Sequence, residues 1–184
     1  MSKSLPTDPI IFFPGIVFHE FSHVIACYLT GVAVHHVKWF GTDEAYVSHA
    51  KPNAWQGLII AIAPFLLGNL IGISLLQFGH VLAAQLSVVS LLVYWFGFSL
   101  VLYSFPSKQD ALNAFNAFTD FYKRRVLEKG DMATRFFWLL TFPVFFVPII
   151  VILGLILLFD TAFVLRILWV FAALMLSLST TTIF

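Results

Sequence analysis

The chain has 184 residues, of which 60% are hydrophobic and only 10% are charged. A soluble domain carries about a quarter of charged residues, and one small core has too little volume to bury this much apolar side chain. The composition therefore excludes an ordinary soluble domain and predicts an integral membrane protein. The formal net charge of +1 gives no electrostatic reason to expect a nucleic-acid partner.

Apolar stretches long enough to cross a lipid bilayer recur along the chain. A hydrocarbon core about 30 Å thick needs roughly 20 mainly apolar residues in a helix. Five stretches meet this requirement, so we expect an all-α polytopic membrane protein with a single membrane-embedded domain over residues 1–184. The predicted transmembrane helices are residues 9–32, 54–76, 81–104, 135–159 and 161–184.

The connections between these spans are short on one side of the membrane and long on the other. Gly79 in QFGH is expected to break the helix between the second and third spans, and Asp160 forms nearly all of the last turn. Residues 33–53 alternate apolar and polar side chains around GTDE, which predicts a short β-hairpin. In residues 105–134, Ser107 is expected to cap an amphipathic juxtamembrane helix.

Most basic residues fall on the side of the two long connections. The positive-inside rule places that side in the cytoplasm and the N-terminus outside, and five spans then leave the C-terminus in the cytoplasm. Lys3 and Arg166 fall on the other side, where Arg166 is expected to extend outward to the interface. The basic residues of the cytoplasmic side are Lys38, Lys51, Lys108, Lys123, Arg124, Arg125, Lys129 and Arg135.

The first span carries polar groups where lipid is expected. Its sequence GIVFHEFSHVIACYLTG, residues 15–31, places His19, Glu20 and His23 near the middle of the membrane. The two histidines are four residues apart, so both imidazoles project from one face of a helix and can reach one metal ion. Glu20 lies beside them, in position to take a proton from a water that the metal polarises. This is the H-E-x-x-H arrangement of zinc hydrolases, and it predicts a Zn²⁺ site with Glu20 as the acid/base.

A purely structural explanation of these three residues is also open. Ionisable groups at that depth cost several kcal/mol unless they are paired, bound to a metal or reached by water. A hydrogen-bonded polar cluster that joins neighbouring helices meets the same requirement without a metal.

The motif and its surroundings resemble the site-2 proteases, the family of intramembrane zinc metalloproteases. The small residues Ala26 and Gly31 after the motif are similar to that family, as is the extended segment that follows the first helix. The stretch IAIAPFLLGNLIG resembles the family's segment of small residues and proline with a nearby asparagine, although Asn69 follows Pro64 at a wider spacing than usual. The likeness covers the first two predicted spans and their connection.

The resemblance implies a membrane-embedded core with His19 and His23 as zinc ligands and Glu20 as the catalytic residue. It also implies that Asn69 contributes to substrate binding. The substrate of such an enzyme is a membrane protein or peptide within the lipid bilayer.

The third zinc ligand is the open question of the predicted site. A zinc hydrolase uses three protein ligands and leaves a fourth position for water. The family takes the third from an Asp-Gly motif after a proline; this chain has no Asp-Gly, and the nearest equivalent is Asp110 after Pro106 in SFPSKQDALNAF. Asp110 is equally explained as a carboxylate in the first turn of a helix. Counting residues puts Asp110 at the cytoplasmic surface and His23 deeper, so either the third span ends inside the bilayer or another residue binds.

The rival ligands all belong to the hairpin connection. His49, in AYVSHAKP, is the best of them, as a ligand, a substrate-positioning donor or an interfacial histidine. The others are Asp43, Glu44, His35 and His36, of which the two adjacent histidines are more typical of a solvated pair.

The leading hypothesis is a zinc-dependent intramembrane endopeptidase that hydrolyses peptide bonds in or near membrane-spanning segments. Its metal ligands are His19, His23 and Asp110, and its active site opens to the cytoplasmic side. Three alternatives use the same residues: a membrane protein that binds or transports a metal, a non-catalytic adaptor with a vestigial zinc site, and a zinc hydrolase acting on a lipid or a small amide.

Overall fold

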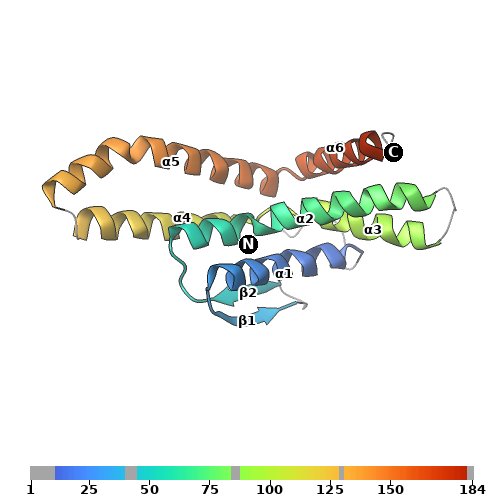
Figure 1. Ribbon diagram of the computed structural model, residues 1–184, viewed down its shortest axis with the longest axis horizontal. Helices are drawn as coiled ribbons and strands as arrows, with labels where there is room; N and C mark the ends of the chain where they lie inside the picture. The colour runs from blue at the N-terminus through green and yellow to red at the C-terminus, as the bar shows by residue number, and fades with distance from the viewer. Residues whose placement is uncertain (1–10, 40–44, 84–87, 129–130, 182–184) are drawn as a thin grey trace.

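The chain folds into an elongated helical molecule with one small sheet (Figure 1). The computed structural model describes residues 11–39, 45–83, 88–128 and 131–181. Within them the predicted mostly helical fold and the hairpin are confirmed. The elements are α1 (Phe13–Thr30), β1 (Val34–Lys38), β2 (Tyr46–His49), α2 (Ala54–Ala83), α3 (Val88–Leu102), α4 (Lys108–Tyr122), the π-helical turn η1 (Lys123–Glu128), α5 (Met132–Thr161) and α6 (Phe163–Thr181).

The hairpin follows α1 after a sharp glycine turn. Gly31 adopts φ 73°, a left-handed conformation that glycine reaches without steric cost, and this ends the helix. Strands β1 and β2 then pair antiparallel, with Val34 opposite His49 and Lys38 opposite Tyr46. The GTDE turn, with the candidate ligands Asp43 and Glu44, lies outside the described residues.

Helix α2 continues beyond its predicted end. The stretch QFGH is helical, so the expectation that Gly79 breaks the chain there is wrong. A Cβ atom at Gly79 would lie 3.0–3.2 Å from ring atoms of Tyr94 in α3. The glycine therefore allows the ring to approach the α2 backbone, and the connection to α3 falls in residues 84–87, outside the described part of the chain.

Helix α3 covers Val88–Leu102, a shorter range than the predicted third span of residues 81–104. Its 15 residues span about 22 Å at 1.5 Å per residue, less than a bilayer core. A non-helical segment follows, and Ser107 then caps α4 as predicted. Helix α4 packs its small side chains on α2, where a Cβ at Gly57 would lie 2.8 Å from the Cβ of Ala117. Its phenylalanines Phe115 and Phe118 instead contact Phe146 of α5.

Helices α5 and α6 follow one another along the long axis instead of folding back (Figure 1). Asp160 belongs to α5, so the turn predicted there is absent, and Ala162 alone separates the two helices. Helix α6 runs parallel to α2: Trp169 contacts Asn69, and Ser177 contacts His80 near the end of α2.

The membrane prediction is supported by two helices among the described residues. Helices α2 and α5 are long and apolar enough to cross a bilayer, by length and composition. Only 6% of the most apolar window of α5 is buried within the protein, against 33% for α2. An apolar helix this exposed is typical of a lipid-facing segment.

Candidate metal centre

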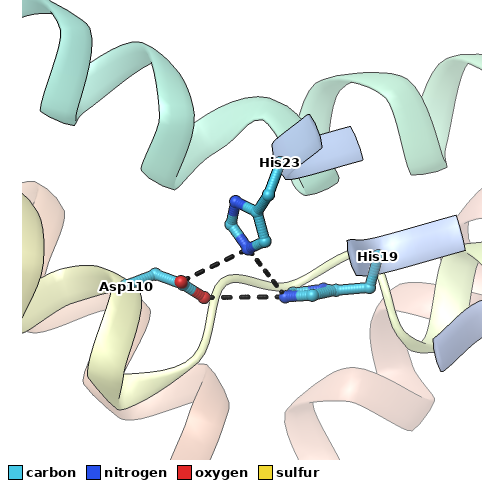
Figure 2. Close-up of side chains that lie close together, drawn as sticks. All are labelled: His19, His23 and Asp110. Atoms are coloured by element: carbon cyan, nitrogen blue, oxygen red, sulfur yellow. Dashed lines mark hydrogen bonds and ion pairs between the residues drawn. The ribbon is translucent and has the colours of Figure 1, made fainter. Parts of the chain in front are cut away.

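Two elements distant in sequence bring three potential ligands together. His19 and His23 project from α1, and Asp110 projects from the first turn of α4 (Figure 2). One ligand atom from each residue lies within 4.8 Å of the others. The Nε2 atoms of the two histidines are 3.2 Å apart. His23 Nε2 lies 3.3 Å from Asp110 Oδ1, and His19 Nε2 lies 3.5 Å from Asp110 Oδ2.

The backbone fixes which ring nitrogen of each histidine faces the cluster. His19 Nδ1 lies 2.9 Å from the carbonyl oxygen of Tyr103, and His23 Nδ1 lies 2.8 Å from that of Ile60. A carbonyl oxygen only accepts hydrogen bonds, so each Nδ1 must donate. In the neutral rings both Nε2 atoms then carry lone pairs directed toward each other and toward a carboxylate. Metal-ligating histidines in proteins are oriented in this way by a second hydrogen bond.

The three residues fit a zinc ion in chemistry and in spacing. Imidazole nitrogen and carboxylate oxygen are ordinary zinc donors, and three of them leave one tetrahedral position for water. Zinc bonds of about 2.0–2.1 Å at tetrahedral angles separate the donor atoms by about 3.3–3.4 Å. The separation of the two Nε2 atoms, 3.2 Å, is close to that value, and each Nε2 lies 3.3–3.5 Å from a different oxygen of the Asp110 carboxylate.

Asp110 both caps α4 and faces the histidines. Its Oδ2 accepts hydrogen bonds from the backbone N–H and the hydroxyl of Ser107, which completes a capping box at the start of α4. Its Oδ1 faces His23. The fold therefore brings Asp110 to His23, whereas counting residues along the predicted third span separates them.

Glu20 is buried beside the cluster. It is 9% exposed, and its carboxyl group interacts electrostatically with His19, His23 and Asp110. Among the residues that the structure describes, it has no hydrogen-bond partner. A buried carboxyl group without a partner is costly, and it is commonly found where a ligand or water completes its bonding.

The other predicted site residues do not join the cluster. His49 lies in β2, and its Nδ1 donates to the carbonyl of Ala50. Asn69 lies in the middle of α2, where its amide bonds Phe65, Ser104 and Trp169. Their predicted contacts with a substrate stay predictions. The rivals His35 and His36 are exposed on β1.

A polar cleft of about 550 Å³ lies between the hairpin and α4. His49 is on one wall, and Asn113, one turn beyond Asp110, is on the other. The ion pair between Lys51 and Asp120 joins the same two walls. Strand β2 pairs only with β1 within the described residues.

Two parts of the site were missed from the sequence. The carbonyl groups of Tyr103 and Ile60 are backbone atoms and have no signature in residue type. The side chains that hold residues 103–107 were also missed, although the buried Arg166 carried a signal, because a charge inside an apolar helix needs a partner. Comparisons with models of known protein families, with curated proteins and with solved structures found no match to this chain.

Proposed function

We propose that the chain is a membrane-embedded zinc endopeptidase that hydrolyses peptide bonds in or near membrane-spanning segments. The observation that carries the proposal is the convergence of two histidine lone pairs and the Asp110 carboxylate beside the buried Glu20. The resemblance of the motif to the site-2 proteases agrees with this assignment. In this proposal His19, His23 and Asp110 hold the metal.

The chemistry is divided between the metal and one side chain. Zinc, when bound, polarises both a water and a peptide carbonyl. Glu20 then accepts the proton that the attacking water releases, and afterwards donates it to the nitrogen of the leaving amine. A carboxyl group without a competing hydrogen-bond partner is free to accept a proton from the water and to donate it to the leaving amine. Tyr103 and Ile60 keep the two imidazoles in one tautomer throughout.

The surroundings of the site favour a polypeptide as the substrate. A peptide carbonyl becomes available for attack only where the substrate is not helical, because a helix already uses its carbonyl groups. The polar cleft between the hairpin and α4 suits an extended segment, which would lie along the hairpin as a further strand. The length and apolar composition of α2 and α5 support a location of this arrangement in the lipid bilayer.

The hairpin faces the cytoplasm in this proposal. Lys38 lies in β1, Lys51 follows β2, and Lys123 lines the same cleft as Lys51. The positive-inside rule favours the cytoplasmic side for such a group of basic residues. The cleft between the hairpin and α4 lies beside them, which favours entry of water and substrate from the cytoplasm.

A reconstituted cleavage assay tests the proposal. The purified chain is placed in liposomes with a set of single-span peptides, and products are identified by mass spectrometry. We expect cleavage by the wild type and none by Glu20→Gln, while the zinc content of the variant is unchanged. Glu128→Gln, at an exposed position in η1, is the matched control and keeps full activity. Full activity of Glu20→Gln contradicts the proposed mechanism.

A further inference from the structure

We infer that Trp169 and Arg166 of α6 are positioning residues for the metal centre, which they hold in place through residues 103–107. This inference rests on the metal site of the proposed function. It follows from the contacts that the segment between α3 and α4 makes with residues at the junction of α5 and α6.

Residues 103–107 connect α3 to α4 and carry two supports of the site. The carbonyl of Tyr103 accepts the hydrogen bond that orients His19. The backbone N–H and the hydroxyl of Ser107 hold the carboxylate of Asp110. The segment has no helix or strand of its own to keep its shape. A displacement of this segment therefore moves one ligand directly and reorients a second.

A chain of hydrogen bonds fixes the segment to α6. The indole N–H of Trp169 donates to Asn69 Oδ1 at 2.7 Å, and Asn69 Nδ2 donates to Ser104 Oγ at 3.0 Å. The hydroxyl of Ser104 in turn donates to the carbonyl of Val101, at the end of α3. The indole bond also fixes the orientation of the Asn69 amide, since its oxygen must face Trp169 and its nitrogen must face Ser104.

Aromatic packing holds the next residue of the segment. The ring of Phe105 is stacked on Phe159 at the end of α5, with centroids 4.5 Å apart and planes at 7°. Phe65 and Trp169 enclose it at centroid distances of 5.4 and 6.1 Å. The guanidinium carbon of Arg166 lies 5.9 Å from the centroid of the same ring.

Arg166 ties this packing to the junction of α5 and α6. It is 5% exposed, and it donates to the carbonyl of Phe159 at 2.7 Å and to Asp160 Oδ1 at 2.8 Å. The outward extension predicted for Arg166 is therefore wrong. A buried charge costs free energy unless it is paired, and Asp160 supplies the pairing charge here. The guanidinium lies over the Phe105 ring, so this ion pair connects the ring to the junction of α5 and α6.

The test removes one hydrogen bond and leaves the ring volume nearly intact. Trp169→Phe deletes the indole N–H that orients Asn69. Trp95→Phe is the matched control, because Trp95 also donates its indole N–H to an acceptor at 2.7 Å, the carbonyl of Ile11, away from the metal cluster. Arg166→Lys is the second variant, since it keeps the charge and cannot reproduce both guanidinium bonds.

Three measurements separate positioning from folding: zinc affinity by chelator competition, the visible absorption of bound Co²⁺, and hydrogen exchange of amides 103–107 in metal-free protein. We expect Trp169→Phe and Arg166→Lys to weaken zinc binding about tenfold, the lower end of the range for outer-shell partners, and to alter the Co²⁺ spectrum. Exchange in residues 103–107 should become faster, with a melting temperature equal to that of Trp95→Phe.

The outcomes distinguish this inference from the proposed function. If both α6 variants match Trp95→Phe in zinc affinity and in exchange, the inference is overturned and the metal site stands. If the wild type binds no metal, the proposed function and the inference fall together. A loss of cleavage with unchanged metal affinity and exchange also overturns the inference, because it assigns the α6 residues to substrate contact.

Discussion

The Nε2 atoms of His19 and His23 lie 3.2 Å apart, although each ring has already used its Nδ1–H on a backbone carbonyl. Two neutral imidazoles in this arrangement have only lone pairs to offer each other, which is repulsive. The pair is stable with a cation between the rings, either a proton or a metal ion. Asp110 supplies the balancing negative charge on the open side. The two backbone carbonyls therefore orient both Nε2 atoms toward Asp110, an arrangement that could hold a metal ion.

The first prediction concerns the ligand set. We expect about one zinc per chain in detergent-purified wild type, as in a three-ligand site of this type. His23→Ala and Asp110→Ala should lose the metal, because each removes a donor from a site with only three. His49→Ala should retain it, since His49 bonds Ala50 and lies outside the cluster. Metal content by mass spectrometry measures all four proteins.

Two results contradict this assignment in different ways. If His49→Ala loses zinc and Asp110→Ala retains it, the third ligand is His49 in the hairpin and not Asp110. Absence of metal in carefully purified wild type favours a non-catalytic adaptor and removes the basis for a hydrolase.

The second prediction concerns Ser107, which both caps α4 and bonds the Asp110 carboxylate. Ser107→Ala removes the cap at a cost of about 1 kcal/mol in the free energy of unfolding. It also removes the hydroxyl that bonds the Asp110 carboxylate, so this proposed ligand is held less firmly and zinc affinity should fall by about 10- to 100-fold. Ser74→Ala is the control, because Ser74 lies exposed in α2 and bonds only its own helix. Equal zinc affinities of the two variants would show that the cap does not orient Asp110.

Much of the site could be predicted because its determinants are local. The spacing of His19 and His23 places them on one helical face whatever the remainder of the chain does. Ser107 and Asp110 are three residues apart, a spacing typical of a capping box. The depth of Asp110 could not be predicted, because Tyr103 and Phe105 prolong the apolar run past the true end of α3. Hydropathy does not detect a helix end inside an apolar stretch.

The errors elsewhere share a physical cause, which is tertiary packing. Gly79 looked like a helix breaker, but a ring of α3 packs against it and the helix continues. Asp160 looked like a turn residue, but it is helical and pairs with Arg166 across the junction at Ala162. In each case local propensity misjudges the residue, because a partner distant in sequence or across a helix break determines its conformation.

The third prediction concerns the contact of α1 with α3. A Cβ at Gly15 would lie 2.1 Å from the backbone oxygen of Ser99, which no side-chain rotation relieves. Gly15→Ala should therefore lower the free energy of unfolding by about 1–3 kcal/mol, as overpacking does. Gly154→Ala, where a Cβ meets nothing within 4 Å among the described residues, is the control and should be tolerated. Thermal unfolding in detergent compares them, and equal melting temperatures would exclude this close approach.

The fourth prediction concerns pH and the contact between the hairpin segment and α4. A hydrogen bond from Lys51 holds the pKa of Asp120 below its usual value. A depressed pKa in the folded state means that the pair stabilises the fold above the unfolded pKa of about 3.9, and that this contribution disappears as pH falls through the folded value. Lys51→Met should raise the pKa of Asp120 in a carboxyl titration by NMR.

The control for that titration is Asp131, whose pKa is lowered by hydrogen bonds from Thr134 instead. The pKa of Asp131 should be the same in wild type and in Lys51→Met. An unchanged pKa of Asp120 would mean that the ion pair does not form in solution.

The fifth prediction concerns the side on which the chain ends. Five antiparallel spans place the C-terminus in the cytoplasm with the hairpin. The contacts of Trp169 with Asn69 and of Ser177 with His80 make α6 parallel to α2, so α6 ends beside the C-terminal end of α2, away from Ala54, where the chain enters α2 from the hairpin. If α2 crosses the membrane, the C-terminus and the hairpin must then lie on opposite sides, and the number of crossings is even.

One epitope tag at the C-terminus and one inserted between β1 and β2, in separate proteins, should show opposite protease accessibility in sealed vesicles. Equal accessibility of the two tags would mean that α6 runs against α2 in the membrane, and the Trp169–Asn69 bond would be lost with it.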